Sequence, residues 1–359
     1  MTKRPTLTDV ARLAQVAPST ASLAFSTGGS IKPATKQRVL QAAAELDYRG
    51  PNPMGRNLRQ QSSGVVALVI GATLQHHFRD PVARAVLDGL SERLATHDLG
   101  VLLIPQIHDP RSGKRVPGLQ PLQRAAYDVA VLIGCTREHR SVLSHLRDRG
   151  IPIIGLEGPD FDDIHQLNVA DQDGFARLTR ELLQLGHRRI ATVTLPFQDQ
   201  RRFHVHRRED IAISDIPVGT TQRRIAALDD AGITPCAVIE TTGSRIDQGK
   251  AAAQELLSQP EPPTAIMAQS DVLAGGVVLA AEEMGFRVPR DVTVTGFDGV
   301  DIPWLGDHKL TTVAQPLREK GHAAGDLILQ ALEGKTPTVQ RLPTHLKWGT
   351  TSGAVNPEV

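Results

Sequence analysis

The side chains near the N-terminus that are best suited to chemistry are hydroxyls on one short segment. Ser19, Thr20 and Ser22 follow Pro18, which suits the first position of a helix because its missing N–H has no partner there. Hydroxyls on a short helix can approach phosphate oxygens closely, and such a helix can enter the major groove of DNA. The alternative is a small helical cap whose Ser and Thr content reflects only its exposure to solvent. The pattern favours contact with nucleic acid.

Two more short helices are expected to position these hydroxyls. Thr8 is a candidate N-cap for a first helix, because an acidic residue and then apolar residues at helical spacing follow it. A third helix is expected over residues 33–46. Three short helices, the second of them after a tight turn, predict a helix-turn-helix domain over residues 1–49, the head.

The charge of the chain is unevenly distributed. The first 63 residues hold nine Lys and Arg residues against three acidic ones, a formal charge of +6, so a whole-chain charge of +1 leaves −5 for the remainder. A basic N-terminal part on a mildly acidic remainder is the electrostatic pattern of a nucleic-acid binder. The 359 residues, 40% of them hydrophobic, are enough for two or three globular domains.

The sequence shows no membrane or export signal. No run of about 18 apolar residues occurs, and the first residues lack an apolar signal core, so we expect a cytoplasmic, nucleoid-associated protein. Cys135 and Cys236 form no CxxC pair and are expected to be reduced and structural.

Four segments of the head share one spacing pattern, namely residues 6–11, 16–22, 35–43 and 46–48. In this pattern the head resembles the lactose-repressor (LacI/GalR) family of bacterial transcription regulators. The resemblance implies that Thr6, Thr20 and Ser22 contact phosphates. It also implies that bases are read from the positions of Pro18, Ser19 and Leu23.

The head departs from that family at three positions. Relatives usually carry Arg where this chain has Leu23, which can offer only apolar contact, for instance to a thymine methyl group. Two serine N-caps of the family are replaced by Ala17 and Lys32, each followed by Pro, which can start a helix but loses the cap hydrogen bond. DNA binding is still expected, but with a different operator sequence.

Residues 50–63 are expected to form a hinge. A Gly- and Pro-rich start precedes a possible short helix with Asn52 as its cap, too short to be stable alone in water. We expect it to be disordered alone and ordered on DNA; a flexible linker is the alternative. The resemblance implies a minor-groove helix that contacts DNA through Asn52 and Arg56 and inserts Leu58 between base steps.

Residues 64–359, the body, alternate apolar strand-like runs with helical segments such as 82–94. Expected strands are 65–70, 101–104, 129–133, 151–154, 190–193, 265–267 and 292–295. Buried strands separated by helices predict an α/β fold with parallel sheets, divided into two lobes with a cleft. Ligands bind such sheets at the carboxyl ends of the strands.

Six segments of the body extend the resemblance over nearly the whole chain: 185–191, 270–276, 287–292, 296–299, 310–316 and 342–344. They imply a body like periplasmic sugar-binding proteins, with dimerisation through the body and a small-molecule effector such as a sugar. Among the implied effector-binding residues, Asp80 and Val82 match the first cleft loop. Ser270 stands where the family has Asn, and Asp298 where an acid grips a ligand hydroxyl. The alternative is that Asp298, like Asp271, only caps turns and helices.

The expected effector site departs from the family on one segment. Thr220 stands where relatives carry an Arg that clamps the ligand, and Arg223-Arg224 stand where a Gly-aromatic pair is usual. One of these arginines, with Arg223 as the candidate, is expected to take the place of the family's ligand-clamping Arg from a neighbouring turn. Residues 201–208 hold two His beside arginines and could bind an anion or a metal, but a solvated loop is favoured. Residues 108–120 are also expected to be an exposed loop.

No sequence motif indicates catalysis. The chain lacks G-x-G-x-x-G after a strand, a P-loop, G-x-S-x-G and any metal-ligand motif, so we expect no enzyme, cofactor or metal. The sequence predicts a repressor that binds a pseudo-palindromic operator in double-stranded DNA as a homodimer under the control of a small effector. A regulator controlled by a protein partner or by no ligand, and a transport-type binding protein, remain as alternatives.

Overall fold

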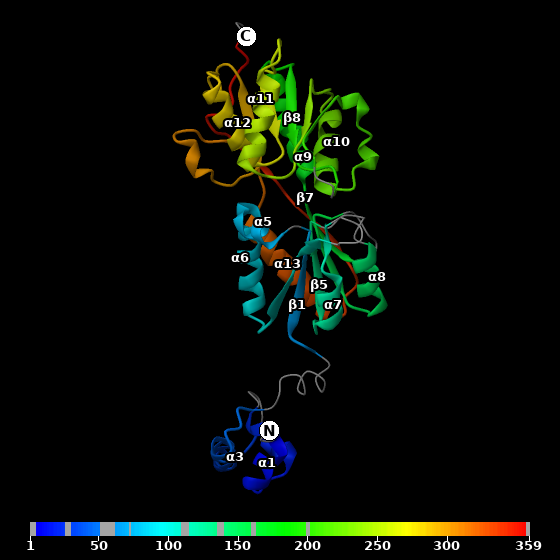
Figure 1. Cartoon of the computed structure of the whole chain (residues 1–359), viewed down its shortest axis with the longest axis vertical. Coiled ribbons are helices and arrows are strands. Elements are labelled where there is room, and N and C mark those ends of the chain that lie inside the picture. Colours follow the sequence, from blue (N-terminus) through cyan, green and yellow to red (C-terminus); the bar gives the residue numbers. More distant parts are fainter. Residues whose placement is uncertain are drawn as a thin grey trace. The chain divides into compact units, whose positions relative to one another are not determined.

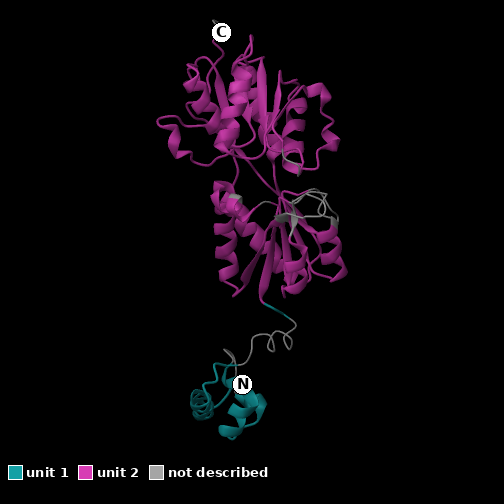
Figure 2. Ribbon diagram, in the orientation of Figure 1, with its two compact units in different colours: residues 1–63 teal, residues 64–359 magenta. Residues whose placement is uncertain are grey.

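The computed structural model of the chain describes residues 5–25, 30–50, 62–71, 73–108, 115–134, 140–158, 163–198 and 202–356. The chain divides into two compact units, residues 1–63 and residues 64–359 (Figure 2). In the part of the chain that the structure describes, no helix has the length and apolar character needed to cross a membrane.

The head contains the three predicted helices, α1 (Leu7–Leu13), α2 (Pro18–Ala24) and α3 (Pro33–Glu45). Small side chains let them pack closely, and the fully buried core consists of Val10, Ala11, Ala14, Ala21, Ala24, Val39, Ala42 and Ala43. As expected, Ala17 and Lys32 are N-caps without a side-chain hydrogen bond, each followed by Pro at the first helical position.

The predicted cap of the first helix was wrong. Helix α1 begins two residues earlier, with Thr6 rather than Thr8 as its N-cap. The Thr6 hydroxyl accepts from the backbone N of Asp9 at 3.4 Å, and the Asp9 carboxylate accepts from the backbone N of Thr6 at 2.9 Å. This reciprocal capping box needs an acid three residues after the cap, and Thr8 is followed at that spacing by Ala11.

The body consists of two lobes, each built on one sheet covered by helices (Figure 1). The N-terminal lobe has a parallel six-stranded sheet in the order β14-β7-β6-β5-β1-β2. Its strands are β1 (Val65–Ile70), β2 (Gly100–Ile104), β5 (Val129–Ile133), β6 (Ile153–Leu156), β7 (His165–Val169) and β14 (Val339–Leu342). Its helices are α5 (Leu74–Arg79), α6 (Pro81–Ala95), α7 (Leu119–Arg124), α8 (Arg140–Asp148) and α13 (Leu317–Leu332).

The C-terminal lobe has a seven-stranded sheet in the order β15-β13-β12-β11-β8-β10-β9, antiparallel only at its two edge strands. Its strands are β8 (Ile190–Thr194), β9 (His204–His206), β10 (Val238–Glu240), β11 (Ala265–Ala268), β12 (Thr293–Asp298), β13 (Thr311–Ala314) and β15 (His345–Lys347). Its helices are α9 (Asp171–Gln184), α10 (Gly219–Asp230), α11 (Ile246–Leu257) and α12 (Asp271–Glu283), with short 3₁₀ turns η1 (Arg208–Asp210), η2 (Ile213–Asp215) and η3 (Pro303–Leu305). The expected two-lobed α/β fold is therefore confirmed.

The chain passes between the lobes three times: from β7 to α9, from β13 to α13, and from β14 to β15 (Figure 1). Two of these crossings are bonded to each other. The backbone N of Ala170 donates to the carbonyl of Leu342 at 2.8 Å, and the Thr344 hydroxyl donates to the carbonyl of Ala170 at 3.0 Å. The crossing segments lie at the ends of strands, next to the cleft.

In each lobe one helix pair packs at backbone distance through glycine. A Cβ on Gly321 of α13 would lie 2.2 Å from the carbonyl oxygen of Val86 on α6. A Cβ on Gly249 of α11 would lie 2.1 Å from the carbonyl oxygen of Leu273 on α12. Any side chain at either position would push the helices apart.

The two expected loops are partly strands. Residues 106–108 (β3) pair antiparallel with 115–117 (β4), and α7 follows at Leu119. Residues 204–206 form β9, which pairs antiparallel with β10, so the prediction of a solvated loop there was wrong. The strand was missed because it is short and polar, and its partner β10 lies more than 30 residues further along the chain.

Candidate functional site

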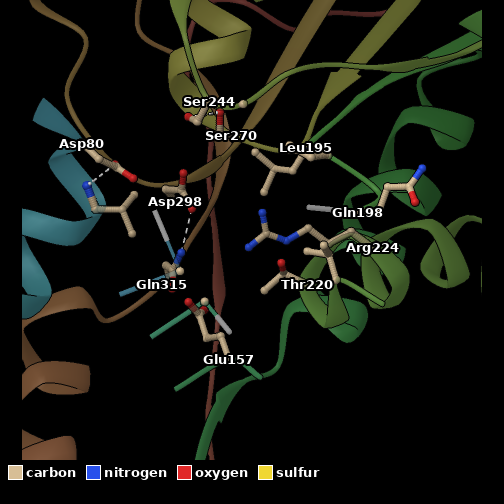
Figure 3. A pocket seen from close by; sticks show the side chains of 16 residues that line it. Asp80, Glu157, Leu195, Gln198, Thr220, Arg224, Ser244, Ser270, Asp298 and Gln315 are labelled. Carbon is tan, nitrogen blue, oxygen red and sulfur yellow. Dashed lines mark hydrogen bonds between the residues drawn. The ribbon is translucent and has the colours of Figure 1, made fainter. Parts of the chain in front are cut away.

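A cavity of about 230 Å³ lies between the lobes of the body (Figure 3). It is lined at the carboxyl ends of strands, where α/β sheets bind ligands: Gly71, Gly134 and Glu157 follow strands of the N-terminal lobe, and Leu195, Gly243, Ser270, Asp298 and Gln315 end or follow strands of the C-terminal lobe. Asp80, Val82, Pro196, Gln198, Val218, Thr220, Arg224 and Ser244 complete the lining.

Five of the six predicted effector residues meet in this cavity: Asp80, Val82, Thr220, Ser270 and Asp298. Asp80 is the N-cap of α6, and one of its carboxylate oxygens accepts from the backbone N of Val82 at 2.9 Å. Ser270 is the N-cap of α12, where its hydroxyl accepts from the backbone N of Leu273 and lies 2.8 Å from the Ser244 hydroxyl. Both side chains therefore start a helix and also face the cavity.

Asp298 ends strand β12 in a strained backbone conformation, with φ at +120°. Its Oδ1 accepts from the Gln315 side-chain amide at 2.7 Å, and the Oε1 of Gln315 accepts from the buried Lys320 ammonium at 2.7 Å. Burial raises the pKa of Asp298 well above its ordinary value; Arg224 opposes the shift, and Asp271 and Asp80 add to it. Burial therefore extends the pH range over which this carboxyl keeps its proton, compared with an exposed aspartate.

Asp271 has a structural role, as the alternative interpretation held. Its carboxylate accepts from the backbone N of Val300 at 2.8 Å and from the Thr312 hydroxyl at 2.6 Å, and so ties α12 to the segment after β12 and to β13. Burial raises its pKa to about 7, although these hydrogen bonds favour the charged form. Asp271 does not line the cavity, whereas Asp298 does.

Arg224, rather than Arg223, lines the cavity. The Arg224 side chain is 3% exposed and donates to the carbonyl of Gln269. Figure 3 shows its guanidinium pointing into the space that Asp298 and Gln315 face from the other side. Arg223 instead donates from Nε to Asp171 at 2.8 Å. Arg224 lies four residues after Thr220 and so on the same face of α10, one turn along.

Glu157 and Gln315 are lining residues that sequence reasoning missed. Glu157 lies 3.0 Å from the Lys320 ammonium. Burial raises its pKa most strongly, but Lys320 and Arg224 outweigh that effect and lower it overall. The signal that could have found both residues is position, because each comes directly after a buried strand.

Behind the cavity wall lies a second polar cluster around Glu240, whose side chain is fully buried. The Glu240 carboxylate accepts from the backbone N of Phe197 at 3.1 Å, from Nε of Arg202 at 3.1 Å and from Nε2 of His206 at 2.9 Å. The His206 ring stacks on Phe197 at 4.9 Å. In the described ranges no three His, Cys, Asp or Glu side chains are grouped so that they could hold a metal ion. The cluster attaches β9 to the lobe.

The head presents one face of α2 to solvent. Pro18, Ser19 and Leu23 are exposed, and Thr20 and Ser22 are half-buried. Thr6 is exposed at the start of α1. The hinge residues Asn52, Arg56 and Leu58 lie outside the described residues.

Comparison with known proteins bears on both units. The family described as "Bacterial regulatory proteins, lacI family" matches residues 6–52, and "Periplasmic binding protein-like domain" matches residues 179–352. An HTH-type transcriptional regulator of Mycobacterium tuberculosis is 31% identical over 98% of this chain and 98% of its own.

Two solved structures show the same fold. The transcriptional regulator CelR in complex with cellobiose is 25% identical over 97% of this chain and 100% of its own, with a TM-score of 0.67. The Lac repressor dimer bound to operator and the anti-inducer ONPF is 22% identical over 98% of this chain and 100% of its own, with a TM-score of 0.78. The chain is a DNA-binding transcriptional regulator and belongs to the lacI family of bacterial regulatory proteins.

Proposed function

We propose that this regulator is a repressor that binds a pseudo-palindromic operator as a homodimer and is controlled by a small polar effector held in the cavity. It acts by binding alone, without catalysing a reaction. The observation that carries the proposal is the cavity itself. Charged and hydroxyl side chains from both lobes converge at the carboxyl ends of their strands, in a chain that also has a basic three-helix head.

The cavity lining indicates the chemistry of the effector. Asp80 and Asp298 offer carboxyl oxygens to hydroxyl or amine donors, and Arg224 offers N–H donors to an acceptor on the opposite wall. The volume of about 230 Å³ is below the range of roughly 300–1,000 Å³ typical of drug-sized ligands. These features favour a compact polyhydroxylated metabolite such as a monosaccharide. The similar regulator CelR, solved in complex with cellobiose, supports a sugar-like class.

Control of DNA binding would follow from the two walls of the cavity. A ligand shifts a conformational equilibrium only if it binds the two states with different affinity. An effector that touches Asp80 on one lobe and Arg224 on the other binds tightly only when the lobes hold these side chains at the right separation. Its binding would therefore select one arrangement of the lobes.

The head and hinge supply the proposed DNA contacts. Thr6, Thr20 and Ser22 would contact phosphates, and Pro18, Ser19 and Leu23 would face base edges in the major groove. The exposure of α2 on this face supports that assignment. Asn52, Arg56 and Leu58 are proposed to contact the minor groove between the two half-sites.

A second copy of the chain is proposed to pack on the free edge of the N-terminal lobe. Strand β2 is the last strand of its sheet, and it exposes Val101 beside Phe78 of α5 in one apolar groove. Exposed apolar edge strands favour pairing with another chain, and two-fold dimers are the commonest oligomers. The Lac repressor in the comparison is a dimer, which supports an assembly of two chains.

The test is selection of binding sites by the full chain from a random duplex pool at physiological salt, followed by screening of metabolites for release of the selected site. Enrichment of a pseudo-palindrome that a small metabolite releases or tightens supports the proposal. A pseudo-palindrome indifferent to every metabolite would favour control by a protein partner. No enriched sequence, either without or with added metabolites, would contradict the proposed pseudo-palindromic operator.

A further inference from the structure

The exposed face of α2 carries no side chain that can form a bidentate hydrogen bond. The helix reads Pro18-Ser-Thr-Ala-Ser-Leu-Ala24 and contains no Arg, Lys, Asn, Gln, Asp or Glu. Discrimination of guanine or adenine in the major groove rests mainly on Arg, Lys, Asn or Gln. Hydroxyls can bond to either kind of base and therefore discriminate weakly. The only large side chain on this face is that of Leu23.

Leu23 is not part of the head core. Its side chain is 42% exposed, and it lies outside the packed cluster formed by Ala21, Ala24 and the apolar residues of α1 and α3. Ser19, one turn before it on the same face, is also exposed. A helix-turn-helix domain turns this face toward the major groove. In this head the face therefore presents the Ser19 hydroxyl and, one turn later, the Leu23 side chain.

One apolar group marks a base in the major groove, the C5-methyl of thymine. From the chemistry of this face we infer that the operator half-site is read by α2 through a thymine methyl in contact with Leu23. This inference rests on the proposed function, because it assumes that α2 enters the major groove. The positive charge of the first 63 residues supplies the attraction to the duplex, and that attraction is independent of sequence.

The experiment uses the full chain and the duplex that it selects from a random pool. Each thymine is replaced in turn by deoxyuridine, first in one half-site and then at both symmetric positions, which removes the methyl and leaves every hydrogen-bonding group. We expect one position at which this change weakens binding by about fourfold for one half-site and about 15-fold for both, the effect of one buried methyl each. At that position cytosine should also weaken binding, and 5-methylcytosine should restore most of the affinity.

The variant Leu23→Ala tests whether the effect of the thymine methyl depends on the Leu23 side chain. It should bind the thymine duplex and the deoxyuridine duplex with equal affinity. Leu40→Ala is the matched control, because Leu40 is 43% exposed but lies on α3, and this variant should keep the full difference. The deoxyuridine series on the unaltered chain tests the methyl without any change to the fold.

Two results would overturn the inference alone: a selected operator with no methyl-sensitive position, or a methyl effect that persists in Leu23→Ala. A pool from which no sequence is enriched, either without or with added metabolites, would overturn the proposed operator binding and this inference together. The two failures are thus distinguishable in one series of measurements.

Discussion

The guanidinium carbon of Arg224 lies 3.6 Å from the centroid of the Phe297 ring. The ring belongs to β12, one residue before Asp298, and the arginine belongs to α10. The stack holds a buried cation in one orientation against the cavity wall, and the bond to Gln269 fixes its rotation. A planar guanidinium can stack in this way, whereas an ammonium group cannot.

We therefore expect Arg224→Lys to weaken binding of the effector by about tenfold or more, the effect of roughly 1.4 kcal/mol. Binding to the operator without effector should change by less than about twofold. Calorimetry with the metabolite that most raises the melting temperature of the unaltered chain measures the first quantity. Arg180→Lys is the control, since Arg180 is exposed on α9 and outside the lining. Equal losses in the two variants would contradict a specific role for Arg224.

The pair Asp271 and Asp298 should make the body less stable as pH rises. Burial raises the pKa of Asp271 to about 7 from 3.8 and raises that of Asp298 as well, so the folded chain keeps protons that the unfolded chain releases. The stabilisation is fully present below about pH 4 and is lost as pH rises toward 7. Urea unfolding between pH 5 and 7.5 should show this decline, and Asp298→Asn, which keeps an acceptor for Gln315, should reduce it. The exposed Asp173→Asn is the control, and an undiminished decline in Asp298→Asn would refute the assignment.

The capping box of α1 predicts different effects for two neighbouring threonines. Thr6→Ala should raise amide hydrogen exchange in α1 about fivefold, because loss of an N-cap costs about 1 kcal/mol. Thr6→Ser keeps the hydroxyl and should have little effect. Thr8→Ala removes an exposed side chain that caps nothing and should leave exchange unchanged. Sensitivity at Thr8 and not at Thr6 would show that the helix begins elsewhere.

The buried Glu240 should be essential for attachment of β9. Glu240→Gln leaves only one accepting oxygen, which cannot serve both the Phe197 backbone N on one side and Arg202 and His206 on the other, so a donor at the buried carboxylate loses its partner. With a cost of about 2 kcal/mol, we expect a fall in melting temperature of about 5 °C. Glu209→Gln, at an exposed position of η1, should change it by less than about 1 °C. A melting temperature unaffected by Glu240→Gln would mean that the cluster contributes no stability.

The sequence predicts elements whose signal is local. The aliphatic runs of β1, β5 and β11 and the apolar face of α6 fall within two residues of their predicted bounds. Strand β7 was missed because His165, Gln166 and Asn168 interrupt its apolar pattern, although all three are buried. Its pairing with β6 and β14 compensates for that polarity, and such a partnership depends on residues far away in the chain.

Prediction of the residues that line the cavity is limited in the same way, because only locally recognisable residues can be found from the sequence. Asp80 and Ser270 were predicted through the family resemblance, because both lie on segments that match the family's pattern. The choice between Arg223 and Arg224 could not be made, since adjacent positions on a helix differ by about 100° in direction and only packing shows which one faces the ligand. The only local signal for Glu157 is its position after a buried strand, and its ion pair depends on the buried Lys320 ammonium of a distant helix.

The three crossings between the lobes also limit how the body can report an occupied cavity. A single connecting segment would let one lobe turn about many axes, but three segments that lie close together, two of them bonded through Ala170, leave little besides one rotation. A ligand that binds anywhere on the lining would then shift the lobes along the same axis. The body would behave as a sensor with one output coordinate, so chemically different effectors would differ in how far and in which sense they move the lobes along it.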